Sequence, residues 1–322
     1  MIRYFARRLA FALVLVIGVS SATLMLTRLA PGDFITESLG TGASQQTIAA
    51  QRARYGLDKS IAAQYRDWLA GAVRFDLGYS MQYGRPVRDL IPERAANTAI
   101  LAITALLFAT LIGLPLGVIT GSRRGGAIPA TIRAASLILL SMPPLLTSLF
   151  LIFLAARTGW LPIAGMRSAS VPDGGAAFDL LRHLVVPAAA IALPLAAMLE
   201  RLQAQAMSEV IDAPFVLATL ARGVPRSRVL WRGALKAALR PVAGVYGLVI
   251  GSLLSGSFAV EVITAWPGLG SLMLQALRTR DIYLVAGCAG AGALFLACGT
   301  LVSDVALAAV DPRVSDTRTE RA

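Results

Sequence analysis

Charged residues, histidine and cysteine are all scarce in this sequence of 322 residues. Asp, Glu, Lys and Arg make up 15% of it, against about 25% in ordinary soluble domains. Histidine occurs once, at His183, and cysteine twice, at Cys288 and Cys298, within one apolar run. Two similarly placed cysteines argue against a disulfide framework. One histidine without a Cys/His cluster gives no basis for a metal site.

The residues needed for nucleotide binding or hydrolytic chemistry are also missing. Lys59 and Lys236 are the only lysines, and neither ends a GxxxxGK[ST] loop, so the chain is not expected to bind ATP phosphates in the P-loop manner. No GxSxG or HExxH pattern occurs, which argues against an intramembrane enzyme. Apart from Glu261 and Asp304, both near span ends, we expect the spans to be nearly free of acids. A proton or sodium pathway would then have few ligands.

Long apolar runs dominate what is present. The chain is 56% hydrophobic with a mean hydropathy of +0.68, which indicates a membrane protein. Each of six runs is long enough for a bilayer of about 30 Å at a rise of about 1.5 Å per residue. They cover residues 9–26, 95–120, 132–156, 184–206, 242–264 and 283–309.

The first run could be a cleaved signal peptide or a retained membrane helix. It has 18 residues, whereas the apolar region of a signal peptide has roughly 7 to 15. Ser20 to Ala22 also make a poor cleavage site. We therefore expect residues 1–30 to form an N-terminal membrane anchor helix.

The net charge of +12 would suggest nucleic acid in a soluble chain, but the basic residues follow the predicted spans. With the N-terminus inside, the cytoplasmic side carries 16 Lys and Arg, and the two short outer loops carry 5. This bias predicts six spans with both termini cytoplasmic and no nucleic-acid partner.

Residues 31–94 form the longest polar segment. Over residues 31–95 it holds 8 basic and 7 acidic residues, a balance that does not resemble a nucleic-acid patch. Residues 48–55 and 61–73 are predicted to be short amphipathic helices, and 75–91 a turn-rich loop. We expect an extracytoplasmic scaffold, which either receives a delivery protein or is simply a solvated loop.

Proline and glycine recur within or beside the spans, as at Pro143-Pro144, Pro187, Pro194, Gly113 and Gly117. Small residues allow helices to approach closely, and proline leaves backbone groups that need other partners. The pattern fits a bundle that moves, and equally ordinary packing of membrane helices.

The polar stretch 209–241 interrupts the apolar second half of the chain. Asp212 as N-cap, Pro214 in the first turn, and Gly223 followed by Pro225 predict a short helix over 213–222. A helix this short needs tertiary contacts to be stable, so its apolar residues suggest a docking partner. Beyond Pro225 a second helical run carries cations at four-residue spacing, at Arg228, Arg232, Lys236 and Arg240, which suits an anionic membrane surface.

The run from Leu217 to Gly223, followed by Leu239-Arg240-Pro241, resembles the EAA loop of bacterial ABC importer permeases. In that motif Glu-Ala-Ala and three further residues precede Gly, and a hydrophobic-x-Pro ending follows. LTRLAPGD after the first run, FDLG and YGRPV, EVITAWPGLG, and Val310-Asp311-Pro312-Arg313 resemble the first-subunit branch of the dipeptide/oligopeptide/nickel permease family. Leu217-Ala218-Thr219 stands where the motif has Glu-Ala-Ala, so its acidic contact is missing.

The resemblance covers residues 1–313 and implies an all-α integral membrane protein with the type I ABC importer permease fold. It implies a core permease domain over 95–313, a cytoplasmic coupling loop over 207–241 and a cytoplasmic tail over 314–322. The ATPase-coupling residues would be Phe215, Leu217, Ala218, Thr219, Leu220, Arg222 and Gly223.

Candidates for the translocation path lie on the fifth span, namely Ser252, Ser255, Ser257 and Glu261. An acid near a span end is costly unless it is paired or hydrated, so Glu261 is a functional candidate. It could equally be an interfacial acid that caps the short helix after Trp266-Pro267-Gly268. Asp304 could simply pair with a cytoplasmic arginine.

The resemblance also implies the partners. These are a homologous second permease, one or two cytoplasmic ABC ATPase subunits that bind ATP and Mg, an extracytoplasmic solute-binding protein and the lipid bilayer, with no cofactor in this chain. The implied location is the bacterial cytoplasmic (inner) membrane, as a multi-pass protein. We expect a non-enzymatic subunit for import of di- or oligopeptides. Nickel, glutathione or sugars are the alternatives within the family, and an ion-coupled secondary transporter is the alternative outside it.

Overall fold

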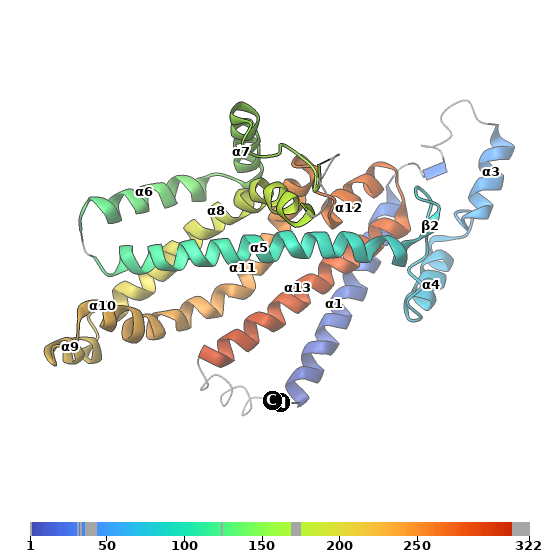
Figure 1. Ribbon diagram of the computed structural model, residues 1–322. Helices are drawn as coiled ribbons and strands as arrows, with labels where there is room; N and C mark the ends of the chain where they lie inside the picture. Colours follow the sequence, from blue (N-terminus) through green and yellow to red (C-terminus); the bar gives the residue numbers. More distant parts are fainter. Residues whose placement is uncertain are drawn as a thin grey trace. The chain divides into compact units, whose positions relative to one another are not determined.

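The computed structural model describes residues 2–30, 32, 34–35, 44–123, 125–168 and 175–310, without the side chains of residues 2–5, 255 and 306–310. Figure 1 shows a chain built almost entirely of helices. It divides into two compact units, one made of residues 1–99 and 265–297 and the other of 100–264 and 298–322. The Asp311-Pro312-Arg313 motif and the predicted tail 314–322 lie outside the described residues.

The first unit begins with the long apolar helix α1 (Ile2–Leu29) and two short helices, α3 (Gln45–Arg54) and α4 (Ile61–Ala72). Both short helices were predicted, and each is capped by a serine side chain that accepts a backbone N–H: Ser44 from Thr47 and Ser60 from Ala63. Such caps satisfy donors that the first turn leaves free.

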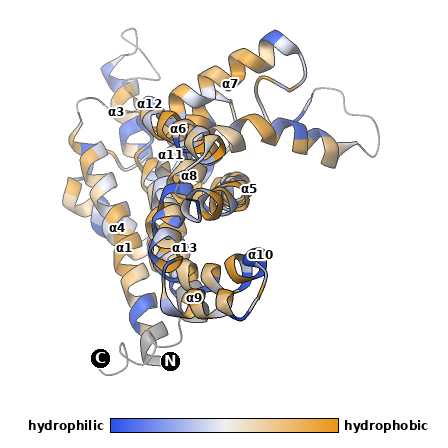
Figure 2. Ribbon diagram, turned by 90° about the vertical axis from the view of Figure 1, so that its left-hand side faces the viewer, coloured by the Kyte–Doolittle hydropathy of each residue, from blue (hydrophilic) through white to orange (hydrophobic). Residues whose placement is uncertain are grey.

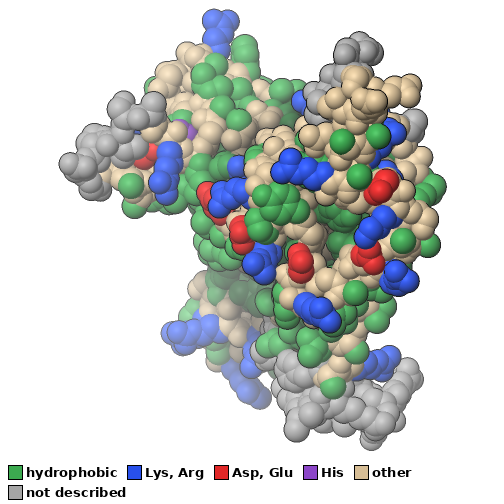
Figure 3. Space-filling view, turned by 90° about the vertical axis from the view of Figure 1, so that its right-hand side faces the viewer, with side chains coloured by type: hydrophobic (Ala, Val, Ile, Leu, Met, Phe, Trp, Pro, Cys, Tyr) green, Lys and Arg blue, Asp and Glu red, His purple; other side chains and the backbone are tan. Residues whose placement is uncertain are grey.

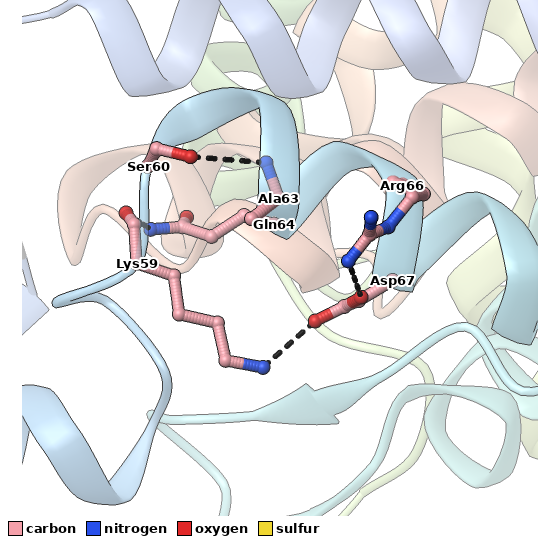
Figure 4. Close-up of polar contacts among 6 residues, drawn as sticks. All are labelled: Lys59, Ser60, Ala63, Gln64, Arg66 and Asp67. Atoms are coloured by element: carbon pink, nitrogen blue, oxygen red, sulfur yellow. Dashed lines mark hydrogen bonds and ion pairs between the residues drawn. The ribbon is translucent and has the colours of Figure 1, made fainter.

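The face that carries these short helices is polar and mixed in charge. In Figure 3 basic and acidic side chains lie interspersed on it. Figure 4 shows one pair, in which Lys59 Nζ lies 2.7 Å from Asp67 Oδ2. Their hydrogen bond and charges raise the pKa of Lys59 and lower that of Asp67. Because both side chains are about half exposed, solvent screens the pair and its effect on stability is small.

The predicted loop over 75–91 is more ordered than expected. It contains a two-stranded antiparallel hairpin, β1 (Tyr79–Ser80) and β2 (Arg85–Pro86), in which Tyr79 pairs with Pro86. Helix α5 (Val87–Gly121) begins directly after it, eight residues before the predicted start of the second apolar run. The composition of the first two turns hid this helix, since they include Arg88, Asp89 and Glu93.

Two later helices complete the first unit, α12 (Leu269–Arg278) and the first part of α13 (Ile282–Val310). They form a hydrophobic core with Val87 of α5, and its other buried residues are Leu269, Leu272, Ala276, Leu284, Val285 and Cys288. The turn before α12 is fixed by Trp266, whose buried indole Nε1 donates to the Asn97 carbonyl at 3.0 Å. Asn97 Nδ2 in turn donates to the carbonyl of Pro267 at 2.9 Å, so the turn is locked to α5.

The second unit contains the rest of α5 and the helices α6 (Ala127–Ser141), α7 (Pro144–Thr158) and α8 (Ala176–Val210). A shorter set follows, α9 (Pro214–Ala221), α10 (Arg226–Arg228) and the π-helix η1 (Val229–Ala234), before the long α11 (Leu235–Ile263). Helix α8 is central, since α6, α7 and α11 all pack on it.

Glycines bring α5 and α8 close together. A Cβ placed at Gly117 would lie 2.6 Å from both the Glu200 carbonyl oxygen and Gln203 Cβ, and one at Gly121 would lie 2.8 Å from Met207 Cβ. Gly113 makes the same kind of approach to Ala196 and Leu199. Glycines four residues apart face the same side of a helix, so this stripe lets the two backbones touch.

Five helices of the described residues are long and apolar enough to cross a membrane, or six spans if one bent pair counts as a single span. The expectation of an all-α membrane protein is confirmed. The third predicted span, 132–156, is not one continuous helix, because the chain bends by 107° between α6 and α7. Met142 is extended before Pro143, as steric contact with a proline ring requires of the preceding residue.

Candidate functional site

The candidate site begins with α9, an isolated helix of 8 residues that follows α8. Its predicted N-cap was wrong: Ala213, with φ −64° and ψ 145°, is the N-cap, and Pro214 is the first helical residue. Proline is favoured at that position because its missing N–H would have no helical partner there. Asp212 therefore lies one residue before the N-cap.

Helix α9 is held by one buried residue and exposes most of the others. Val216 is completely buried, while Phe215 and Leu217 are 49% and 54% exposed and Ala218 is exposed beside them. The helix packs on η1. Of the other predicted coupling residues, Thr219 and Leu220 are partly buried, and Thr219 Oγ1 donates to the Phe215 carbonyl at 2.6 Å. An apolar, exposed face on so short a helix is what a docking element presents.

The end of α9 is set by Arg222 and Gly223. Arg222 is an exposed C-cap residue, and Gly223 has φ +80°, the left-handed conformation that glycine adopts without strain. A Cβ at Gly223 would meet no atom within 4 Å. The requirement for glycine here is therefore one of backbone conformation, as predicted, and not of space.

Beyond Gly223 the chain is tied back to the end of α5. Arg226 Nη2 donates to the carbonyl oxygen of Ser122 at 3.2 Å. Arg133 of α6 donates to the carbonyls of Thr120 and Arg123 at 3.1 and 3.2 Å. Two arginines thus occupy carbonyls that the C-terminal turn of α5 leaves free.

The predicted cationic stripe is exposed, but its spacing is not that of a continuous α-helix. Arg228, Arg232, Lys236 and Arg240 are all exposed. The π-helix η1 lies between the first and third of them, and its i→i+5 bonding widens the turn. Figure 2 shows α10 as strongly hydrophilic beside the more hydrophobic α9.

The candidates for a translocation path lie far from α9. Ser252 is exposed and Ser257 buried, and each hydroxyl donates to a carbonyl of its own helix, that of Val249 at 2.8 Å and that of Leu254 at 2.9 Å. Glu261 is fully buried at the far end of α11, while the side chain of Ser255 lies outside the described residues. With 29 residues, α11 is about 43 Å long, so the structure does not bring Glu261 to the predicted coupling residues. The role of these four residues stays a prediction.

Sequence reasoning missed a polar cluster in the middle of the second unit. Glu200 and Gln203 of α8 are 1% and 0% exposed, and Thr120 Oγ1 donates to Glu200 Oε1 at 2.5 Å. Glu200 falls within the predicted span 184–206, which contradicts the expectation of acids only near span ends. Two features of the sequence could have indicated this cluster: the presence of Glu200 in an apolar run, and the four-residue spacing of Gly113, Gly117 and Gly121.

Together these features define a polytopic α-helical membrane protein with a short, partly exposed helix, α9, between two long spans. Two family models match the sequence: the binding-protein-dependent transport system inner membrane component over residues 113–316, and the N-terminal component of the same system over residues 1–102. The chain belongs to this family. It is therefore a multi-pass inner-membrane permease subunit, and this membership does not favour an ion-coupled secondary transporter.

Full-length relatives support the same assignment. The chain is 32% identical over 316 residues to the oligopeptide transport system permease protein AppB of Bacillus subtilis, covering 98% of this chain and 99% of the relative. It is 30% identical over 335 residues to the dipeptide transport system permease protein DppB of Escherichia coli, with 98% and 99% covered.

Proposed function

We propose that this chain is the membrane-spanning subunit of an ATP-driven importer for di- or oligopeptides. The observation that carries the proposal is α9, a helix of 8 residues anchored by Val216 with Phe215 and Leu217 turned outward. The names of its full-length relatives, which specify oligopeptide and dipeptide transport, support peptide as the substrate. Nickel, glutathione and sugars remain the alternatives for the uptake assay to separate.

In this proposal the energy comes from one or two separate ATPase subunits that bind ATP and Mg, and α9 docks on them from the cytoplasmic side. Both termini are then cytoplasmic. A homologous second permease completes the pathway, and an extracytoplasmic solute-binding protein delivers the substrate. The polar segment 31–94, with α3, α4 and the hairpin, faces that delivery protein.

The mechanical link follows from the local structure. ATPase closure displaces α9, which packs on η1, and η1 runs into α11 without an intervening loop. The hydrogen bond of Arg226 to Ser122 passes the same displacement to the end of α5. Movement of one short helix thus reaches two long spans and supports alternating access.

The test is reconstitution of the complete transporter in liposomes with its ATPases, second permease and binding protein. We expect ATP-dependent uptake of a labelled dipeptide, and Leu217→Arg should abolish ATPase co-purification while membrane insertion persists. Val73→Arg, at a residue that is 74% exposed and distant in sequence, is the matched control and should retain the ATPase. ATPase retention by Leu217→Arg would contradict the docking role, and uptake of nickel or sugar in place of peptide would contradict the substrate.

A further inference from the structure

The segment from Arg226 to Arg240 carries many cations on a continuous helical backbone. Between residues 213 and 260 the sequence holds six Lys and Arg and no Asp or Glu. Helix α10, the π-helix η1 and the start of α11 follow one another here without a loop. The positive charge of this segment is therefore held on one helical rod and is not balanced by acids of the same rod.

Burial divides this rod into a packed side and an exposed side. Val229 is 4% exposed, and Ala234 is completely buried. Trp231, Arg232 and Lys236 are exposed, and the exposed fraction of Trp231 is 46%. The rod thus packs through small and β-branched side chains and presents an aromatic ring and two cations to its surroundings.

The π-helix decides which of the exposed residues share a direction. In an α-helix, residues four apart differ in direction by about 40°, and residues five apart by about 140°. In η1 the i→i+5 bonding lowers the rotation per residue, so residues five apart come closer in direction. Trp231 lies within η1 and Lys236 two residues beyond it, so the indole is turned toward the side of Arg232 and Lys236. Segments of π-helix occur frequently at functional sites.

The position of these residues along the chain puts them beside a membrane span. Residues Arg226–Ile263 form one candidate span of 38 residues, whereas a bilayer core of about 30 Å takes about 20. The apolar run begins at Val242, so Lys236 and Arg232 lie about 9 and 15 Å before it along the helix. Long cationic side chains at such positions reach the headgroups. Arg228 is one turn farther out, and the site proposed below leaves it out.

We propose that Trp231, Arg232 and Lys236 form a binding surface for the headgroups of anionic phospholipids. A guanidinium pairs with a phosphodiester through two hydrogen bonds, and an ammonium adds a point charge. Tryptophan is enriched at the level of the headgroups, where its ring is apolar and its N–H meets water. Cations beside a span attract anionic lipids, and this position favours lipid over an acidic protein surface. The inference does not depend on which substrate the transporter carries.

The test measures which lipid lies next to Trp231. The complete transporter is reconstituted in nanodiscs of phosphatidylglycerol and phosphatidylcholine, with bromine on the acyl chains of one lipid at a time. Quenching of fluorescence that the wild type shows and Trp231→Phe lacks comes from the indole at position 231. We expect phosphatidylglycerol to be enriched at least about fivefold at this ring, the factor that one cation near an anionic surface contributes.

Charge variants connect this enrichment to the two cations. Arg232→Gln with Lys236→Gln should remove the preference for phosphatidylglycerol, whereas Arg232→Lys keeps the charge and should retain most of it. Arg74→Gln with Arg85→Gln removes the same charge at exposed positions of the other unit and should leave the preference as in the wild type. Raising the salt concentration should weaken the preference of the wild type itself, because ions screen exposed charges.

Equal quenching by the two brominated lipids in the wild type would overturn the proposal, as would a preference that survives both the double charge variant and high salt. Co-purification of the ATPase is followed in the same preparations. If the double charge variant loses the ATPase but keeps the lipid preference, the surface binds a protein, which overturns the lipid assignment. A charge-dependent lipid preference in a transporter that takes up no peptide would refute the proposed function alone.

Discussion

Nη2 of Arg226 donates a hydrogen bond to the carbonyl oxygen of Ser122 at 3.2 Å, across 104 positions of the sequence. It connects the segment after α9 to the residue that directly follows α5. Because α9 itself contributes only Val216 to the buried core, this bond helps to attach the segment that we propose to dock on the ATPase. Loss of this hydrogen bond should therefore weaken the coupling of peptide transport to ATP hydrolysis.

Arg226→Gln should lower peptide transport per ATP hydrolysed by several fold, with little effect on insertion. A hydrogen bond of this kind contributes about 0.5–1.5 kcal/mol, enough to weaken transmission without unfolding the unit. The measurement is the ratio of dipeptide uptake to phosphate release in proteoliposomes. Arg228→Gln, two residues on at an exposed position of α10, is the control, and an equal loss in both variants would contradict a specific role for Arg226.

Gly223→Val should uncouple transport from ATP hydrolysis through backbone strain. Its φ of +80° costs a β-branched residue about 1–3 kcal/mol, and relief of that strain would reorient α9. Gly233→Val tests the alternative of simple bulk, since at both positions an added Cβ meets no atom within 4 Å, while Gly233 lies within η1. If the Gly223 variant transports normally, the conformation at the end of α9 is not essential.

Gly117→Ala should destabilise the second unit by about 1–3 kcal/mol, the range for overpacking in a tight core. The added methyl would lie 2.6 Å from the backbone of Glu200, so α5 and α8 must separate. Thermal unfolding in detergent measures the effect. Gly244→Ala in α11, where nothing lies within 4 Å of the new Cβ, should change stability little. If the two variants unfold at similar temperatures, the glycine stripe between α5 and α8 is not tightly packed.

Asp281→Asn should flatten the dependence of stability on pH in the first unit. Asp281 is fully buried before α13 and accepts hydrogen bonds from Ser80 Oγ at 2.6 Å and from the Gln82 and Leu284 backbones at 3.1 and 3.2 Å. Burial raises the pKa of its carboxyl above the ordinary 3.8, although these bonds oppose the shift.

The sign of this pH effect follows from proton binding. Above pH 3.8 the unfolded chain loses the proton while the folded protein still holds it, so stability falls as pH rises toward the folded-state pKa. Unfolding measured from acidic to neutral pH should show this fall in the wild type and less of it in Asp281→Asn. Asp58→Asn, at an exposed carboxyl, should keep the wild-type slope. If Asp281→Asn keeps the wild-type slope of stability against pH, a group other than Asp281 causes the fall in stability.

Local sequence signals predicted much of the helical structure. Pro214 and Gly223, on which the predicted helix over 213–222 rested, mark the ends of α9 through backbone conformation that neighbouring residues decide. The serines that cap α3 and α4 were not recognised as caps from the sequence. The break between α6 and α7 was underestimated, although Pro143-Pro144 was visible, because hydropathy averages over a kink. The hairpin at Tyr79–Pro86 was read as loop, since strands of two residues carry no periodicity.

The sequence by itself determined that this chain spans a membrane in several helices, that it has no P-loop of its own and that a short helix follows α8. Apolar run length, the missing motif and local capping are properties of neighbouring residues. Only the tertiary structure decided that Val216 is buried while Leu217 is exposed, and that Thr120, Glu200 and Gln203 meet across the glycine stripe. Those relationships depend on which faces of distant helices pack together, and side-chain spacing along one helix does not specify its partner.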